Sequence, residues 1–406
     1  MRTVRDPLWS NIHVDPLAMR LVDTPGFQRL RYVRQLGLAH LVYPGATHTR
    51  FEHALGAYHL ARRTLAHLEE CGDLAHVEPA GRSAVLAAAL LHDVGHYPFS
   101  HALEEIGAPN HEDVARPIVM EGEIADILSS SLGRDVPALV FALIRGRSES
   151  PLQGLISGSL DLDKIEYLKR DALMCGVPYG EIDVDRLIDS LTVIVDPTSG
   201  RSVIGVREKG LAALESLLFA KYQMYRNVYW HHAVRSATAM YKRLVFDAVR
   251  AGTVNLATLA SFTDEGLLHH LESVSPGQLV TALRDRRLHK RALELPAGEL
   301  DEDVEWIADD YERVVRVENQ LADDAGVPQG TILLDYPVKT QMLGLDLPVL
   351  RKSGEVRRLT QGGWEGTINL PKLADELYRS ARWLRVFVSA GAKVDSNRLR
   401  DAIRTA

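Results

Sequence analysis

Residues 82–91 form an apolar segment that runs directly into a histidine and an aspartate, His92 and Asp93. The segment is apolar nearly all round, which predicts a buried central helix. A buried imidazole and a buried carboxylate cost free energy unless they are paired or bind a metal ion. Neighbouring positions on a helix differ by about 100°, so two such side chains can converge on one ion. The pair therefore predicts a metal-binding helix end.

The residues that follow the pair are expected to end this helix and to place more histidines beside it. Gly95 and Pro98 both disfavour continuation of a helix. His96 and His101 are then expected on a turn next to the ion.

Further ligands are needed, because one His-Asp pair supplies two and a hydrolytic metal site uses at least three or four. The sequence offers His53, which opens a predicted helix over 54–65, and Asp163, near the start of another over 163–174. Taken singly, each has an ordinary structural explanation as a core residue or a helix N-terminal charge. Together they form a set of two imidazoles and two carboxylates. Mixed ligation of this kind suits Mn, Fe, Zn, Ni or Mg and does not select one metal.

The pattern around this candidate site predicts a mainly α fold. From residue 50 to about 250 the sequence is rich in Ala and Leu and breaks at Gly and Pro, as helical proteins do. Shorter helices are expected over 27–36, 370–381 and 396–403, one long helix or two abutting ones over 211–250, and strands over 331–338, 347–351, 355–359 and 383–388. We predict a helical catalytic domain with a helical extension over 1–325 and a small α+β domain over 326–406.

The composition narrows the class of protein. Of the 406 residues, 46% are hydrophobic and 25% charged, which is ordinary for a globular protein. The formal net charge of -7 argues against broad charge-driven nucleic-acid binding. No apolar run is long enough to cross a membrane, no signal core opens the sequence, and Cys71 and Cys175 do not make a disulfide framework. We expect a cytoplasmic protein with reduced thiols that engages no membrane.

The order His53, His92-Asp93, Asp163 resembles the ligand pattern of the HD-domain phosphohydrolases. Flanking strings narrow the resemblance to the dNTP triphosphohydrolases that combine a SAM domain with an HD domain, and to their bacterial relatives. The strings are DTPGFQRLR at 23–31, QLG at 35–37, YPGA at 43–46, RFEH at 50–53, HDVGHYPFSH at 92–101 and DLDKIEYLKRD at 161–171. The resemblance covers roughly residues 2–250.

This resemblance implies a set of site residues. It implies metal ligation by His53, His92, Asp93 and Asp163, and a catalytic pocket with His96, His101 and His111. It implies phosphate contacts from Arg50 and Lys164, and sugar or base contacts from Gln35, Leu36, Tyr167, Asp171 and Tyr229. It also implies a guanine-nucleotide activator site at a subunit interface with Arg2, Asp23, Gln28 and Arg31.

The resemblance further implies hydrolysis of dNTPs to deoxynucleoside and inorganic triphosphate, with a divalent metal ion as cofactor. His96 or His111 would protonate the departing 5′-oxygen. GTP or a dNTP would activate a homo-oligomer, a dimer or a tetramer. The sequence departs from the family where no glycine follows Asp6-Pro7, and where Asn227 and His232 replace basic residues of vertebrate members.

Two other functions stay open at this stage. One is an HD phosphatase or phosphodiesterase that acts on another nucleotide. The other is a nucleotide- or nucleic-acid-binding protein without turnover. A P-loop or Rossmann enzyme is not supported, since the chain has neither glycine fingerprint, and no G-x-S-x-G elbow supports a serine hydrolase.

Overall fold

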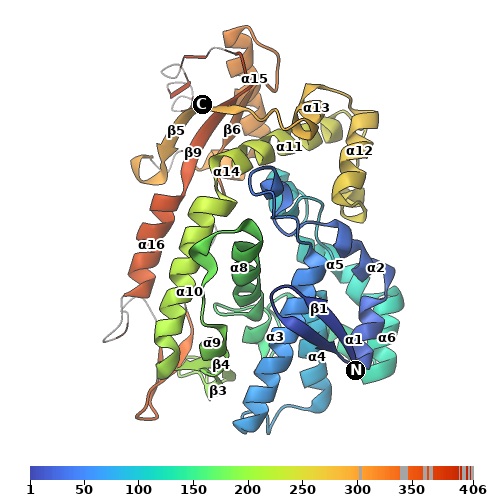
Figure 1. Cartoon of the computed structure of the whole chain (residues 1–406), viewed down its shortest axis with the longest axis vertical. Helices are drawn as coiled ribbons and strands as arrows, with labels where there is room; N and C mark the ends of the chain where they lie inside the picture. The colour runs from blue at the N-terminus through green and yellow to red at the C-terminus, as the bar shows by residue number, and fades with distance from the viewer. Residues whose placement is uncertain are drawn as a thin grey trace.

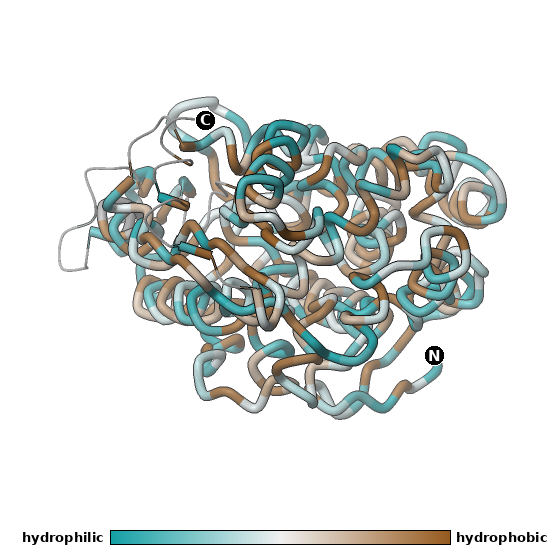
Figure 2. Tube along the Cα trace, turned by 90° about the horizontal axis from the view of Figure 1, so that it is seen from above, coloured by the Kyte–Doolittle hydropathy of each residue, from teal (hydrophilic) through white to brown (hydrophobic). Residues whose placement is uncertain are grey.

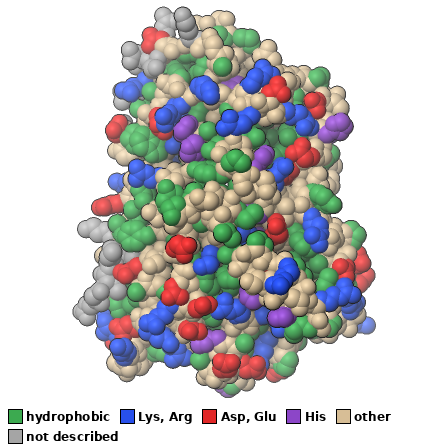
Figure 3. All heavy atoms as spheres, viewed as in Figure 1, with side chains coloured by type: hydrophobic (Ala, Val, Ile, Leu, Met, Phe, Trp, Pro, Cys, Tyr) green, Lys and Arg blue, Asp and Glu red, His purple; other side chains and the backbone are tan. Residues whose placement is uncertain are grey.

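The structure is a computed structural model that describes residues 1–300, 304–338, 346–359, 364, 369–392, 394–395, 399–400 and 403. It is mainly helical with small sheets, as predicted (Figure 1). Within the described residues no single helix is long and apolar enough to cross a membrane, and one sharply bent pair of helices, Gly122–Leu132 and Val136–Ile144, passes that test only when the two are taken together. On the face drawn in Figure 3, acidic and basic side chains are intermixed.

The chain opens with an antiparallel hairpin of β1 (Arg2–Asp6) and β2 (Ser10–Val14), two strands that were not predicted. Its turn forms without the family's glycine. Ser10 adopts a left-handed φ of 59°, and Asp6 accepts hydrogen bonds from the backbone N–H groups of Leu8 and Trp9. Next come α1 (Pro16–Val22), α2 (Pro25–Gln28) and the 3-10 helices η1 (Arg29–Tyr32) and η2 (Gly37–Leu41). The helix predicted over 27–36 therefore ends at Tyr32.

A group of packed helices follows the hairpin region. Its members are α3 (Arg50–Glu70), α4 (Pro79–Leu91), η3 (Ser100–Ile106), α5 (His111–Met120), α6 (Gly122–Leu132), α7 (Val136–Ile144), η4 (Gln153–Leu155), α8 (Leu162–Cys175), η5 (Pro178–Gly180) and α9 (Val184–Ile188). The helices predicted around His53 and Asp163 are α3 and α8. The apolar segment before His92 is α4, whose second half is buried.

Two strands interrupt the helical region and correct the prediction. Leu191–Val195 (β3) and Ser202–Arg207 (β4) form an antiparallel pair around a turn at residues 196–201. β4 also pairs in parallel with β7 (Pro348–Leu350), which pairs with β8 (Val356–Arg358). Two of the predicted C-terminal strands therefore extend a sheet that begins in the helical body.

The predicted long helix is two helices joined by an irregular turn. η6 (Glu208–Gly210) leads into α10 (Leu211–Met224). A π-helical turn at Tyr225–Tyr229 follows α10. α11 (His232–Arg250) then crosses the molecule toward the C-terminal sheet (Figure 1).

Most of the remaining elements lie at the upper end of the molecule in Figure 1, whereas α16 (Leu370–Ala381) runs alongside α10. In chain order, the remaining elements are η8 (Leu256–Ser261), α12 (Asp264–Val274), α13 (Gln278–Arg284), β5 (Lys290–Pro296), η9 (Ala297–Glu299), α14 (Trp306–Asp309), α15 (Tyr311–Ala325), β6 (Ile332–Asp335), α16 and β9 (Trp383–Val388). β9 is central between β5 and β6, antiparallel to both. The helix predicted over 396–403 falls largely outside the described residues.

The buried apolar side chains form two large cores. The first joins the hairpin, α1, α3, α4, α6–α8, β3, β4 and α10. The second joins η3, α11–α13, α15, β6 and β9. Brown hydrophobic and teal hydrophilic residues alternate along the same helices in Figure 2, as expected when one face of each helix packs inward.

Candidate metal centre and catalytic pocket

Three helices place the four predicted metal ligands. α3 begins with a capping box in which Thr49 and Glu52 cap each other, so His53 lies in the first turn. His92 is the residue that ends α4, and Asp93 follows it. Asp163 lies in the first turn of α8, whose N-cap is Asp161, as predicted.

The ligand atoms of these residues converge. His53 Nε2 lies 3.2 Å from His92 Nε2 and 3.0 Å from Asp163 Oδ1. Asp93 lies 3.8 Å from His53 Nε2 through Oδ2 and 3.6 Å from His92 Nε2 through Oδ1. Asp163 is the most exposed of the four, with a side chain 34% exposed, so the site opens to solvent on the α8 side.

The hydrogen bonds of the two imidazoles fit a cation between them. His53 Nδ1 donates to the Glu166 carboxylate at 2.6 Å, and His92 Nδ1 donates to the carbonyl of Ala89 at 2.9 Å. Both acceptors assign the proton to Nδ1, which leaves a lone pair on each Nε2. Two lone pairs 3.2 Å apart repel unless a cation, either a proton or a metal ion, lies between them. The residues present thus fit a divalent ion with mixed N and O ligands.

The carboxylates of the centre are held in their charged form. Burial opposes the charge of Asp93, but Arg50 and His92 lower its pKa overall. For Asp163 the hydrogen bonds from His53 and His92 outweigh burial and place its pKa well below the ordinary value. Burial likewise opposes the charge of His53, whose pKa the Asp163 and Glu166 carboxylates raise to about 10. The site therefore favours a positive charge at its centre.

Sequence reasoning missed the residue that orients His53. Glu166 is fully buried and accepts from His53, from Trp9 Nε1 at 2.9 Å and from Arg170 Nε at 2.8 Å. Arg170 in turn donates to Asp6 at 3.0 Å. The hairpin and α8 thus fix the imidazole that faces the ion. The one signal for Glu166 that the sequence offered was its position three residues after Asp163 on a predicted helix.

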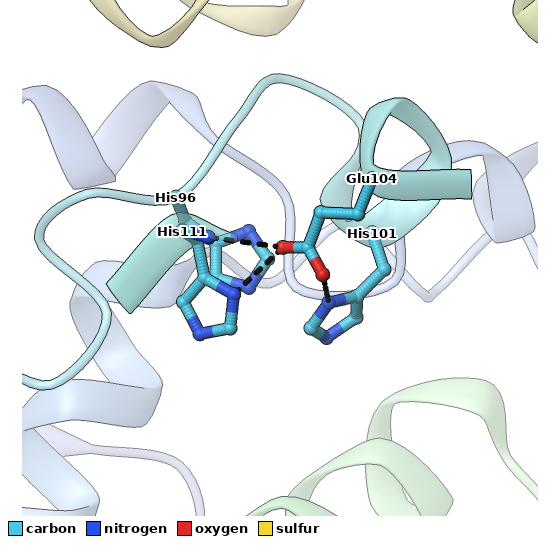
Figure 4. A group of neighbouring side chains, drawn as sticks. All are labelled: His96, His101, Glu104 and His111. Carbon is cyan, nitrogen blue, oxygen red and sulfur yellow. Dashed lines mark hydrogen bonds and ion pairs between the residues drawn. The ribbon is translucent and has the colours of Figure 1, made fainter. Parts of the chain in front are cut away.

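A second cluster of polar side chains lies beside the centre (Figure 4). The Glu104 carboxylate lies between two imidazoles and accepts from His111 Nδ1 at 2.7 Å and from His101 Nδ1 at 3.3 Å. His96 stacks on His111 with a ring separation of 4.1 Å, and its Nε2 is 3.9 Å from Asp93 Oδ1. Three predicted histidines are brought together, and Glu104 is a further member that the sequence analysis did not select.

His96 differs from the other two histidines. It is fully buried, and neither ring nitrogen has a hydrogen-bond partner among the described residues. Burial, together with the positive charge of Arg50, places its pKa well below the ordinary value. His96 is therefore a neutral imidazole at pH 7.

The predicted phosphate-binding residues flank the centre and are engaged with carboxylates. Arg50 is buried and donates to Asp93 at 2.5 Å and to Ser100 Oγ at 2.7 Å. The Lys164 ammonium pairs with Asp161 and donates to the carbonyl of Gly158 at 2.9 Å. Burial and the nearby Lys164 lower the pKa of Lys221, on α10, to about 8. Lys221 is thus an additional buried cation that sequence reasoning missed.

The predicted sugar and base contacts lie around a buried carboxylate, Asp171. It accepts from Tyr229 Oη at 2.7 Å and from His48 Nε2 at 2.8 Å. The Tyr167 ring lies 6.3 Å from that of Tyr229 and 6.5 Å from that of His53.

Gln35, another of these contacts, is buried, and its Oε1 has no hydrogen-bond partner among the described residues. Leu36 follows it and is half-buried. His48, whose backbone carbonyl accepts from the Gln35 N–H, is a further residue that sequence reasoning did not select.

The predicted activator residues lie apart from this cluster, on the hairpin and on the short helices after it. Asp23 ends α1 and is exposed. Arg31 is exposed, donates to Gln28 at 2.7 Å and stacks 3.5 Å from the centre of the Phe51 ring. Arg2, on β1, is exposed as well. Phe51 lies next to Arg50 on α3, so Arg31 contacts the helix that also carries Arg50 and His53.

Comparisons with known proteins place these features in one family. The HD domain matches residues 50–169, and the HD associated region matches residues 182–363. The protein MJ1154 of Methanocaldococcus jannaschii, described as uncharacterized, is 33% identical over 83% of this chain and 70% of its own length. Bovine deoxynucleoside triphosphate triphosphohydrolase SAMHD1 is 30% identical over 57% of this chain and 45% of its own length. The chain spans about half the length of the bovine protein and of Bacillus subtilis YwfO.

Solved structures agree on the fold. A hypothetical protein from Aquifex aeolicus matches 100% of this chain with a TM-score of 0.73 and 28% identity. A phosphohydrolase from Bacteroides thetaiotaomicron matches 96% with a TM-score of 0.75, and at 23% identity it speaks for the fold alone. Together with the convergent His and Asp ligands, these matches show that the chain belongs to the HD-domain superfamily of metal-dependent phosphohydrolases.

Proposed function

We propose that this protein hydrolyses dNTPs to deoxynucleoside and inorganic triphosphate. The observation that carries the proposal is the convergence of four metal-ligand side chains next to the His101–Glu104–His111 cluster. The bovine and chicken relatives that match this region are named deoxynucleoside triphosphate triphosphohydrolases.

His53, His92, Asp93 and Asp163 would hold the divalent ion. When bound, such an ion supplies Lewis acidity, which neutralises phosphate charge and lowers the pKa of water. Arg50 and Lys164 bind the triphosphate, exchanging their present carboxylate partners for phosphate oxygens. The two cations then neutralise the negative charge of the triphosphate during hydrolysis.

His111 is the better candidate for the general acid. Its Nδ1 donates to Glu104, which fixes the ring and leaves Nε2 to carry the transferred proton to the 5′-oxygen. His96 is less suited, because its lowered pKa disfavours the protonated form. We assign His96 a packing role under the His111 ring and His101 the second contact that orients Glu104.

The sugar is bound by the cluster around Asp171. The unpaired Oε1 of Gln35 accepts from the 3′-hydroxyl, because a buried acceptor without a partner is costly until a donor reaches it. Tyr167 packs against the sugar ring, while Asp171 and Tyr229 hold each other in place. Leu36 contacts the base.

Regulation by nucleotide completes the proposal. Asp23, Gln28, Arg31 and Arg2 bind a GTP or dNTP activator at an interface of a homo-oligomer, a dimer or a tetramer, and the enzyme acts in the cytoplasm. Arg2, Asp23 and Arg31 are exposed and Gln28 is half-buried, which leaves this surface available to a second copy of the chain.

The test is product analysis. Purified protein is incubated with each dNTP and Mn²⁺, with and without GTP, and the phosphate products are separated by ion-exchange chromatography. We expect inorganic triphosphate from the wild type and none from Asp93→Asn. Release of pyrophosphate or orthophosphate, or turnover of nucleoside monophosphates or cyclic nucleotides in place of dNTPs, would overturn the proposal. Tight nucleotide binding without hydrolysis across several metals would identify a binding protein.

A further inference from the structure

The side chains of the candidate site are divided between the two cores. The metal-ligand helices α3, α4 and α8 pack in the first core. η3, which carries His101 and Glu104, buries Ala102, Leu103 and Ile106 in the second core, with α11 and the C-terminal sheet. The distance between the metal ligands and the His101–Glu104 pair therefore depends on how the second core holds η3.

The chain enters η3 through a strained turn. Phe99 and Ser100 have φ values of 58° and 67°, in the left-handed region that costs free energy for residues with a side chain. The buried carboxylate of Asp264, at the start of α12, accepts from the backbone N–H of Phe99 at 2.9 Å and from that of Arg34 at 3.0 Å. The Phe99 ring packs 4.8 Å from that of Tyr241 on α11. The second core thus supplies the contacts that hold the strained backbone.

The other end of η3 is held by a buried network of four charges. Glu105, the neighbour of Glu104, accepts two hydrogen bonds from the guanidinium of Arg235 at 3.0 and 2.9 Å. Arg235, on α11, also donates to Asp335 on β6 at 2.9 and 2.6 Å. Lys242 donates to Glu105 at 2.8 Å and lies 3.7 Å from Asp335. Two cations balance two anions, so the burial of these charges is compensated only while all of them stay in place.

We propose that Asp264 and the Glu105–Arg235–Asp335 network are positioning residues that hold the His101–Glu104 turn against the metal centre. The inference rests on the proposed function for its catalytic readout. None of these positioning residues touches the metal ligands; they act through the turn. Displacing a catalytic group by about 1 Å can lower turnover about 100-fold. The C-terminal sheet of β5, β9 and β6 contributes to this positioning, because Asp335 on β6 accepts hydrogen bonds from Arg235 and holds it in place.

The test compares three carboxylate-to-amide substitutions, two at buried residues and one at the half-buried Glu105. Glu105→Gln and Asp264→Asn weaken the two ends of the turn. Glu318→Gln is the matched control, because Glu318 pairs with another buried arginine of α11, Arg243, at 2.9 Å and bonds the backbone of Leu334, without a hydrogen bond to η3. We measure kcat, KM for the dNTP, bound metal per chain, and amide hydrogen exchange in residues 99–106.

We expect kcat of Glu105→Gln and Asp264→Asn to fall about 10- to 100-fold, with KM and metal content within about twofold of the wild type. Exchange in 99–106 rises in these two variants and stays at the wild-type level in Glu318→Gln. Equal losses of kcat in all three variants, or unchanged kcat and exchange in Glu105→Gln, would overturn the proposal.

Hydrolysis of dNTPs tests the proposed function, and hydrogen exchange tests separately whether the network holds the turn. If the wild type hydrolyses no dNTP, the proposed function fails, and hydrogen exchange still decides whether the network holds the turn. If Glu105→Gln does not fold, Arg235→Lys replaces it, since it keeps the positive charge and removes the two-pronged contact with Glu105.

Discussion

At the scale of single residues, the metal centre is organised by the need of each buried imidazole and carboxylate for a partner. The four ligands could be predicted from the sequence because a histidine and an aspartate at the end of an apolar helix require partners. Glu166 could not be selected in this way. Its role depends on the approach of α8 to α3 and on Trp9 of the hairpin, which are tertiary contacts.

The first prediction concerns this carboxylate. Glu166→Gln weakens the acceptor that fixes the Nδ1 proton of His53, so the affinity for a divalent ion should fall about 10- to 100-fold. Titration of apo protein with Mn²⁺ against a competing chelator measures the change. Glu69→Gln, which alters an exposed carboxylate near the end of α3, the helix that carries His53, should leave the affinity unchanged. Equal affinities for wild type and Glu166→Gln would contradict the role given to Glu166.

The second prediction concerns His59, on α3 opposite the hairpin. Burial, with added repulsion from Arg63, lowers its pKa from 6.5 to about 4. The unfolded chain therefore takes up the proton first as pH falls. The stability that neutral His59 contributes is fully present above pH 6.5 and is lost as pH falls toward 4.

His59→Gln removes this titration. The drop in the free energy of unfolding between pH 7 and pH 4, measured by urea denaturation, should be smaller in the variant than in the wild type. An identical drop in both proteins would show that folding does not lower the pKa of His59.

At the scale of elements, the strongly patterned helices and the short C-terminal strands β7 and β8 were predictable, whereas the hairpin, β3 and β4 were not. α16 and β9 have the predicted bounds, 370–381 and 383–388. The hairpin was missed because β1 is largely exposed and carries charges at both ends, so it shows no apolar run. β3 and β4 were absorbed into a long helical region, although β3 contains the β-branched run Thr192–Val195.

The third prediction belongs to the start of α3. Thr49 and Glu52 form the capping box that sets the position of Arg50 and His53. Thr49→Ala removes one side of it and should lower the free energy of unfolding by about 1 kcal/mol. Denaturant titration measures this, with Thr198→Ala on an exposed loop as the neutral comparison. A loss no larger than that of Thr198→Ala would show that the box does not stabilise the helix.

At the scale of the whole molecule, the candidate site lies where two cores meet. The first core presents the metal ligands, and the second presents the turn with His101 and Glu104. The sequence could predict a helical body followed by α+β structure, because periodicity changes after about residue 325. It could not predict that β7 and β8 return to a sheet begun by β3 and β4, since pairing between distant strands leaves no local pattern. The domain boundary at residue 325 and the oligomer stay predictions.

The fourth prediction concerns the binding of one divalent ion by four side chains from three helices. Elemental analysis by mass spectrometry is applied to wild type, His53→Ala and Asp163→Ala, each purified without chelator and checked for folding by circular dichroism. We expect about one Mn, Fe, Zn, Ni or Mg ion per wild-type chain and a large loss of that metal in both folded variants. A wild-type protein without bound metal after incubation with each of these ions, or variants that keep the full metal content, would contradict it.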